Sequence, residues 1–311
     1  MSTELLQLCP LTPALESELA KRFTVHRYFE VQDQKSFLNE HGSAIRAVVT
    51  GGHIGLPADI GAVLPNLEIV AINGVGYDKV DLANAKAKGF RVSNTPDVLT
   101  ADVADAALGL ILAQARRLPQ ADQYTRQGKW LSGEMPLSTR VSGPRYGIFG
   151  LGRIGEAIAK RLEGFDGEIS YCSRNRRDVP YNFYADIKSL ALNVDVLVIA
   201  AAASAETKHI VNAEVLEALG KDGVLVNVAR GSLVDEQALI AALKAGTIKG
   251  AGLDVFEDEP RIPTELFEFD DVILTPHIGS ATQQTRQAMA KLVLANLDAH
   301  FAGEPLPTAV V

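Results

Sequence analysis

The chain has 311 residues, a length that predicts two domains of ordinary size. Its composition, 47% hydrophobic and 22% charged, is typical of a soluble globular protein with a sizeable core. The formal net charge of −8 argues against nucleic acid or an anionic membrane surface as the main partner.

Two features predict a cytoplasmic location. Residues 1–10 contain no basic segment followed by an apolar run, and no apolar stretch approaches the ~18 residues that cross a bilayer. The two cysteines, Cys9 and Cys172, lie far apart and form no metal or redox spacing. We therefore expect two reduced thiols, no metal and no membrane contact.

The first third of the chain alternates apolar runs with helix-like segments. Runs at 44–50 and 67–72 are stopped by Gly51-Gly52 and Asn73-Gly74, and a third run ends at 91–96. Strands separated by helices predict a parallel α/β sheet.

Residues 99–130 are predicted to be mostly helical, with Thr100 as the N-cap. The apolar residues at 103–112 fall on nearly every face, which predicts a buried helix that joins two domains or packs against another subunit. Pro119 should break or kink it.

A second α/β series begins at residue 145. Six strands are predicted, at 146–149, 169–172, 194–200, 223–228, 248–253 and 272–274. This pattern matches a doubly wound dinucleotide-binding domain. Residues 281–300 are predicted to form one long helix that packs back on the first domain. The expected fold is therefore α/β, with two Rossmann-like doubly wound domains and a cleft between them.

The sequence Gly150-Leu151-Gly152-Arg153-Ile154-Gly155 lies between a predicted strand and a predicted helix. In such a loop the first glycine permits the tight turn, the second admits the pyrophosphate, and the third allows close helix packing. The helix N-terminus presents a partial positive charge to the phosphates. The expected cofactor contacts here are Gly150, Leu151, Gly152, Arg153 and Ile154.

The end of the following strand indicates which dinucleotide binds. An NAD site usually places an acid there, whereas this chain has Ser173, Arg174 and Arg176 in a window without one. Arginine can bind a 2′-phosphate by charge-assisted hydrogen bonds, so we expect NADPH/NADP, with NADH as the weaker alternative. The alternative interpretation is a solvated basic loop.

Three reactive residues, Arg230, Glu259 and His277, each follow a predicted strand. Taken singly, each has an ordinary explanation: a surface arginine, one more acid beside Glu257 and Asp258, and a loop histidine. Together, behind a nucleotide loop, they are what the reduction of a 2-keto acid needs: a carboxylate grip, and a proton donor backed by a carboxylate.

Several motifs together resemble the D-isomer-specific 2-hydroxyacid dehydrogenase family, from end to end of the chain. They lie at 74–78, 92–96, 150–155, 227–231, 252–256 and 276–279. Within that family the segments 171–174 and 93–100 most resemble the NADPH-linked glyoxylate/hydroxypyruvate reductases and the related hydroxyphenylpyruvate reductases.

The resemblance implies roles for the matching positions. Arg230 would bind the substrate, Glu259 rather than its two acidic neighbours would contact the histidine, and His277 would donate the proton. Backbone amides near Val75 and Gly76 would hold the substrate carboxylate. Further cofactor contacts are expected at Thr100, Thr207, Asp254 and Gly279, although a structural role for Asp254 is equally compatible with the sequence.

One segment departs from the family pattern. Residues 200–207 keep Thr207 but lack the prolines that many relatives carry, which predicts a looser cofactor-side loop without loss of activity.

The predicted activity is NADPH-dependent reduction of glyoxylate and hydroxypyruvate to D-2-hydroxy acids. Residues 1–98 with 281–311 would form a discontinuous, flavodoxin-like substrate-binding domain, and residues 99–280 the dinucleotide-binding Rossmann domain. The family is commonly dimeric, so a homodimer is expected.

The alternatives are a hydroxyphenylpyruvate reductase, a phosphoglycerate dehydrogenase or, in another class, a nucleotide-sensing corepressor-like binding protein. His53, Leu56 and Trp130 are candidate pocket residues, and for Trp130 an interface or core position is the favoured interpretation.

Overall fold

The computed structural model describes residues 3–311, which divide into two compact units. Unit 1 contains residues 3–99 and 282–311, and unit 2 contains Thr100–Ala281. Within the described residues, no helix is both long and apolar enough to span a membrane.

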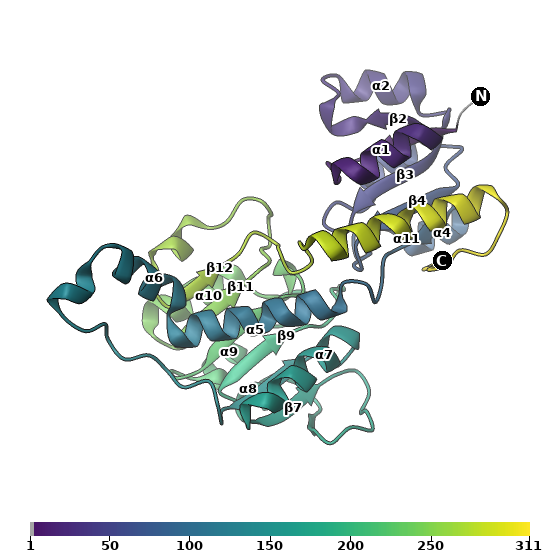
Figure 1. Cartoon of the computed structure of the whole chain (residues 1–311). Coiled ribbons are helices and arrows are strands. Elements are labelled where there is room, and N and C mark those ends of the chain that lie inside the picture. Colours follow the sequence, from purple (N-terminus) through teal and green to yellow (C-terminus); the bar gives the residue numbers. More distant parts are fainter. Residues whose placement is uncertain (1–2) are drawn as a thin grey trace. The chain divides into compact units, whose positions relative to one another are not determined.

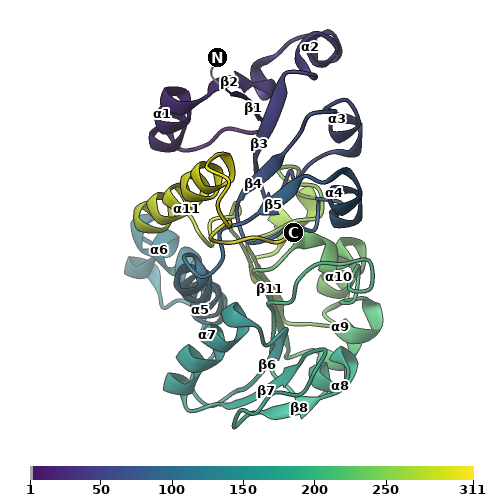
Figure 2. The same cartoon turned by 90° about the vertical axis from the view of Figure 1, so that its right-hand side faces the viewer.

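Unit 1 is built on a five-stranded parallel sheet in the order β2-β1-β3-β4-β5. Figure 2 shows α1 and α11 on one face of this sheet and α2, α3 and α4 on the other. The strands are β1 (Glu4–Gln7), β2 (Thr24–Arg27), β3 (Ile45–Gly51), β4 (Ile69–Asn73) and β5 (Arg91–Ser93). The helices are α1 (Pro13–Arg22), α2 (Gln34–His41), α3 (Ala58–Ala62), α4 (Leu82–Lys88) and α11 (Gln283–Phe301).

The last helix of the chain belongs to unit 1, as expected. Thr282 caps α11 by accepting a hydrogen bond from Thr285 N at 3.2 Å, and the helix packs against β4 and α1. Beyond it the C-terminal segment adds to the edge at β5, where Val310 N donates to Val92 O at 2.7 Å. The C-terminal segment therefore covers the β5 edge of the sheet, while β2 forms the other edge.

Unit 2 is built on a seven-stranded parallel sheet in the order β12-β11-β10-β9-β6-β7-β8. Its strands are β6 (Arg145–Phe149), β7 (Glu168–Cys172), β8 (Asn182–Tyr184), β9 (Val196–Ile199), β10 (Val224–Asn227), β11 (Gly250–Leu253) and β12 (Val272–Leu274). The winding direction reverses between β6 and β9, and ligands of open α/β sheets bind at such a switch point.

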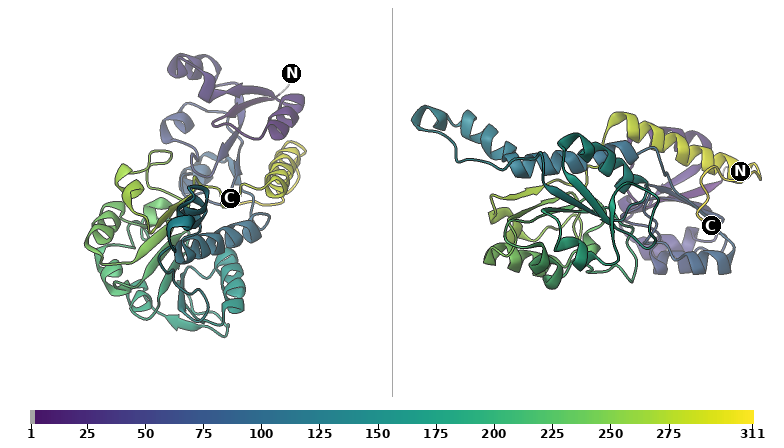
Figure 3. Two further views of the ribbon diagram at one scale, coloured as in Figure 1. Left: turned by 60° about the vertical axis from the view of Figure 1, so that its left-hand side comes forward. Right: turned by 90° about the horizontal axis from the view of Figure 1, so that it is seen from below.

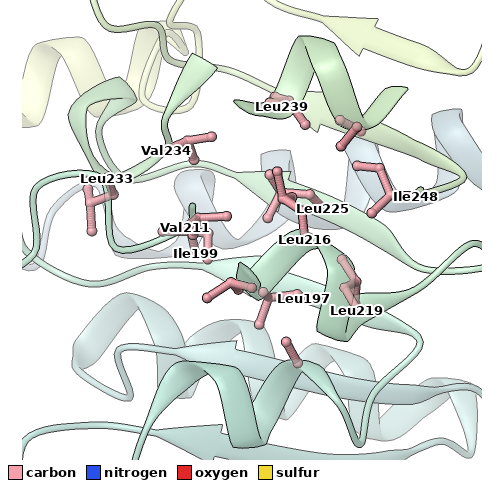
Figure 4. Close-up of a cluster of buried hydrophobic side chains, with 14 of the residues drawn as sticks. Leu197, Ile199, Val211, Leu216, Leu219, Leu225, Leu233, Val234, Leu239 and Ile248 are labelled. Atoms are coloured by element: carbon pink, nitrogen blue, oxygen red, sulfur yellow. The ribbon is translucent and has the colours of Figure 1, made fainter. Parts of the chain in front are cut away.

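Helices cover both faces of this sheet, with α5 and α7 on one side and α8, α9 and α10 on the other (Figures 1 and 2). Their bounds are α5 (Thr100–Arg116), α6 (Leu118–Arg126), α7 (Arg153–Leu162), α8 (Ile187–Ala191), α9 (Ala213–Leu219) and α10 (Glu236–Ala245). Figure 4 shows the core between the sheet and α8–α10, where Leu197, Leu225, Leu216 and Leu239 meet.

Three strands were not predicted. β1 and β2 have four residues each, and β8 has three and lies at the sheet edge with no fully buried residue. Runs this short carry too little periodicity to distinguish a strand from a loop.

The helical segment from residue 100 differs from its prediction in two ways. Thr100 is the first residue of α5 and not its N-cap. The helix buries one stripe rather than every face: Val103, Ala107, Leu110 and Ile111 are buried, whereas Gly109 on another side is exposed. It packs on α7 and on β10–β12 of its own unit, and this contact covers only one side.

The predicted interruption near Pro119 is present two residues earlier, at Arg117. Arg117 adopts a left-handed conformation with φ of 51°, which ends α5, and Pro119 lies in the first turn of α6. Proline is tolerated there because its missing N–H would have no intrahelical partner.

Residues 117–144 form an arm that extends from the sheet of unit 2 (Figure 3). It contains α6 and a short 3-10 helix, Lys129–Ser132. Four large apolar side chains on it are exposed: Leu118, Trp130, Leu131 and Leu137. An arm with this many exposed apolar groups is typical of a surface that another protein covers.

Candidate functional site

The loops after β10, β11 and β12 lie side by side at the carboxyl edge of the seven-stranded sheet. Backbone hydrogen bonds join them beyond the strands: Asp254 N donates to Asn227 O at 3.0 Å, and His277 N donates to Asp254 O at 2.9 Å. The glycine loop after β6 is at the same edge, because all seven strands are parallel. This edge therefore collects the dinucleotide loop and the three reactive residues.

His277 is paired with Glu259. His277 Nδ1 lies 2.7 Å from Glu259 Oε2, and the other carboxylate oxygen accepts a hydrogen bond from Phe256 N at 3.0 Å. The two neighbouring acids have other partners: Glu257 pairs with His209, and Asp258 pairs with Arg261. Of the three acids, the structure brings Glu259 to the histidine.

Asp254 organises the loop that carries His277. Its carboxylate is buried, with 2% of the residue exposed, and accepts hydrogen bonds from Ile278 N, Gly279 N and the Thr275 hydroxyl at 2.8, 2.8 and 2.6 Å. These bonds flank His277, whose φ of 54° is unusual for a residue other than glycine. The sequence was compatible with either a cofactor contact or a structural role for Asp254. These hydrogen bonds give its carboxylate a structural role.

Asn227 positions the backbone around Arg230. Its side-chain amide donates to Arg230 O at 2.9 Å and accepts from Ala229 N at 3.0 Å. The Arg230 guanidinium is partly buried and donates to Ala229 O at 2.8 Å. Asn227 was predicted only as part of the motif at 227–231, although a polar residue that ends an apolar strand is a signal for such a role.

The three glycines of the dinucleotide loop have distinct surroundings. Gly150 has a φ of +99°, and a Cβ there would lie 2.4 Å from the backbone of Ala201. A Cβ on Gly155 would lie 2.1 Å from Gly150 O, so helix and strand pack closely. At Gly152, the N-cap of α7, a Cβ would meet open space. The loop thus leaves room for a phosphate at the helix N-terminus, next to Arg153 and Ile154.

The loop after β7 exposes all three of its arginines, Arg174, Arg176 and Arg177. Ser173 Oγ donates to Asn175 O at 2.7 Å. Arg177, although 48% of its side chain is exposed, is held by its own unit. It pairs with Glu156 on α7 and donates to Leu151 O at 3.2 Å.

The loop after β9 is closed by a side chain. Thr207 Oγ1 accepts from Ser204 N at 2.8 Å and donates to Ala202 O at 3.2 Å. The hydrogen bonds of Thr207 therefore stabilise a turn in this segment, which lacks prolines.

In unit 1, the loop containing Val75 and Gly76 follows β4, at the carboxyl edge of its sheet. It is tied to the next loop, since Asn94 Nδ2 donates to Val75 O at 2.8 Å and Thr95 N donates to Gly74 O at 2.9 Å. Val75 and Gly76 are half-buried. The loop therefore has a fixed backbone whose amides remain near the surface.

The three candidate pocket residues have different surroundings, and the exposure of Trp130 is compatible with the interface position predicted for it. Leu56 is 8% exposed and belongs to the core of unit 1, so it packs between sheet and helix. Trp130 is 70% exposed on the arm, which excludes a core position within this chain. His53 is exposed, with its ring against Gly51.

Both cysteines are buried and unpaired with each other. Burial raises the pKa of the Cys172 thiol to about 11, and it also raises the pKa of Cys9. In both positions burial favours the protonated thiol.

Comparison with known proteins gives a consistent result. The family model for the NAD binding domain of D-isomer specific 2-hydroxyacid dehydrogenases matches residues 108–279. Glyoxylate/hydroxypyruvate reductase A of Arabidopsis thaliana is 52% identical over 311 residues, covering 100% of this chain and 99% of that protein. Hydroxyphenylpyruvate reductase of Plectranthus scutellarioides is 51% identical, covering 98% of each.

A solved structure is similar over the whole chain. It is an NADPH-dependent glyoxylate/hydroxypyruvate reductase of Sinorhizobium meliloti in complex with NADP and malonate. It is 43% identical, with a TM-score of 0.92, and the match covers 100% of this chain and 97% of that one.

Proposed function

The chain belongs to the D-isomer specific 2-hydroxyacid dehydrogenase family, and we propose that it reduces glyoxylate and hydroxypyruvate to D-2-hydroxy acids with NADPH. The observation that carries the proposal is the His277–Glu259 pair, 2.7 Å apart, at the same sheet edge as the glycine loop. A proton donor and a dinucleotide loop at one edge are what the reduction of a ketone requires.

His277 is the proposed proton donor. Because its Nδ1 is held by Glu259, the nitrogen assigned to proton transfer is Nε2. The carboxylate fixes the orientation and the tautomer of the ring. When bound, the nicotinamide supplies the hydride, and His277 protonates the oxygen of the keto group.

Arg230 is the proposed grip on the substrate carboxylate. A guanidinium can form two parallel hydrogen bonds to a carboxylate, and its charge also polarises the neighbouring keto oxygen. Asn227 fixes the backbone on both sides of Arg230, so the side chain starts from a defined position. The amides of Val75 and Gly76 in unit 1 remain proposed contacts of the substrate carboxylate.

The dinucleotide is assigned to unit 2, with unit 1 as the substrate-binding domain. The open space at Gly152 and the N-terminus of α7 suit its pyrophosphate. Ser173, Arg174 and Arg176 are proposed to bind the 2′-phosphate of NADPH. Thr100, Thr207, Asp254 and Gly279 remain proposed cofactor contacts.

The exposed arm supports a homodimer. Trp130, Leu131 and Leu137 expose 70%, 95% and 98% of their surface. Exposing apolar side chains to water costs free energy, and contact with a second copy of the chain would bury them. Light scattering should give the mass of two chains, and Leu131→Glu with Leu137→Glu should lower it toward one. A monomeric mass for the parent protein would contradict this.

A steady-state panel tests the activity. Glyoxylate, hydroxypyruvate and hydroxyphenylpyruvate are each reduced with NADPH and with NADH, and the expected order of catalytic efficiency has the two small acids with NADPH first. Because a hydroxyphenylpyruvate reductase is 51% identical, that enzyme class is the second candidate. The absence of turnover with all three acids would favour a binding protein instead.

A further inference from the structure

A buried carboxyl group lies beneath the segment that carries Glu259. Glu236 is the first residue of α10, only 8% of it is exposed, and its Oε1 accepts a hydrogen bond from Glu257 N at 2.8 Å. The mechanism proposed above does not use this group. It lies only six positions after Arg230 and contacts the segment of Glu259, so it links two parts of the site.

The peptide between Phe256 and Glu257 is held by two contacts. Glu257 N donates to Glu236 Oε1 at 2.8 Å. Gly231 packs directly against the same peptide, because a Cβ there would lie 1.9 Å from the Phe256 carbonyl carbon. Phe256 N belongs to the preceding peptide, joined to this one through the Phe256 Cα, and it donates to Glu259 Oε1 at 3.0 Å. Holding the Phe256–Glu257 peptide therefore also restrains Phe256 N and the oxygen of Glu259 that it binds.

The position is electrostatically unfavourable for a carboxylate. Burial raises the pKa of Glu236, and the nearby acids Glu257, Asp258 and Glu259 add to the rise, while the hydrogen bond from Glu257 N opposes it. His209 partly neutralises Glu257, and Arg261 partly neutralises Asp258. A buried carboxylate next to three other acids does not stabilise the fold through its charge. The role of Glu236 is therefore assigned to the hydrogen bond that it accepts from Glu257 N.

We propose that Glu236 is a positioning residue for the reaction: it fixes the Phe256–Glu257 peptide, thereby orients Glu259 and, through Glu259, sets the direction of the His277 ring. The proposal rests on the proposed role of His277 as proton donor. Glu236 acts as a hydrogen-bond acceptor of the correct length, and its negative charge is not what matters.

Two variants distinguish the effect of side-chain length at position 236 from the effect of its charge. Glu236→Gln keeps the length and an acceptor oxygen but removes the charge, whereas Glu236→Asp keeps the charge but is one methylene too short. We expect E236Q to keep kcat for glyoxylate within about threefold of the parent, and E236D to lower it ~10-fold to 100-fold, the scale of a small misplacement at a reacting group. KM should change less than kcat in both, because Glu236 does not touch substrate.

Asp235→Ala is the matched control. Asp235 is the neighbouring N-cap of α10 and accepts from Ala238 N at 3.0 Å, so its loss weakens the same helix end without touching Glu257 N. D235A should lower the unfolding midpoint and keep kcat at temperatures well below it. If D235A lost as much kcat as E236D, the effect would be general weakening of the helix and the proposal would be wrong.

The other possible results also test the positioning role of Glu236. E236Q as slow as E236D, or E236D as fast as the parent, would overturn the positioning role. His277→Ala is measured alongside: if it keeps full turnover, the proposed proton donor fails as well, whereas an inactive H277A with a fully active E236D overturns the role of Glu236 alone. NADPH fluorescence titration verifies that each variant still binds cofactor.

Discussion

Two regions of unit 2 contrast in how firmly their side chains are held. Around His277, the carboxylates of Glu259 and Asp254 and three backbone amides form a connected set of hydrogen bonds. In the loop after β7, Arg174 and Arg176 are exposed, and Arg177 alone is drawn back to Glu156. A group that must transfer a proton gains from fixed geometry, whereas a loop that selects a mobile phosphate can adapt when the ligand arrives.

The firmly held region should be the most sensitive to substitution. His277→Ala should lower kcat for glyoxylate reduction at least ~100-fold, the usual scale for a removed general acid. His209→Ala is the matched control, since His209 also lies next to a glutamate but on the surface at 2.6 Å from Glu257. Stopped-flow or steady-state kinetics would measure the difference in kcat. Equal kcat values for the two variants would contradict the special role of His277.

Arg230→Lys tests the carboxylate grip next to that region. The charge remains but the two-pronged geometry is lost, so KM should rise and kcat fall, together lowering kcat/KM by ~10-fold to 100-fold. Arg261→Lys, on the surface pair with Asp258, should leave both constants unchanged. Normal kinetics for Arg230→Ala would show that another group binds the substrate.

In the open loop, substitution should redirect cofactor choice without stopping the chemistry. One charge-assisted contact is worth about 1.5–3 kcal/mol, so NADPH should be preferred at least ~10-fold in kcat/KM. Ser173→Asp combined with Arg174→Ala should shift that preference toward NADH, because the new carboxylate repels the phosphate and can accept from ribose hydroxyls. Lys188→Ala, which removes an exposed cation elsewhere, is the control. Equal efficiency with both cofactors in the parent protein would show that these arginines only face solvent.

The smallest effect concerns stability at the firmly held region. Burial raises the pKa of Glu236, so its protonated form is favoured by folding, and the stability it contributes at low pH is lost as pH rises through the raised value. The glutamine in E236Q cannot ionise. At pH 7–8 the thermal unfolding midpoint of this variant should therefore be no lower than that of the parent, and up to about a few degrees higher. Calorimetry between pH 4 and 8 measures this; a midpoint clearly below the parent at pH 8 would contradict the sign.

Much of the fold followed from local sequence. The parallel strands that carry the site were predicted because their apolar runs alternate with helix-like segments in a second α/β series. The strands β1, β2 and β8 were missed because none contains more than two successive apolar residues. The helix α5 was predicted to be buried on all faces, yet it buries one stripe, because the sheet of unit 2 covers only one of its sides.

The sequence by itself determined which residue types are available and where each loop begins. The glycines at 150, 152 and 155, the arginines after β7, and the placement of Arg230 and His277 after strands could be inferred because these depend on neighbours within a few residues. Only the tertiary structure decided which groups meet. It paired Glu259 with His277, a pairing that the local sequence left open among three acids and that the family resemblance alone implied. It also turned Arg177 toward Glu156 and placed Glu236 next to the Phe256–Glu257 peptide. Such pairings join segments about 20 residues apart, and their geometry depends on how adjacent strands align, which no local pattern specifies.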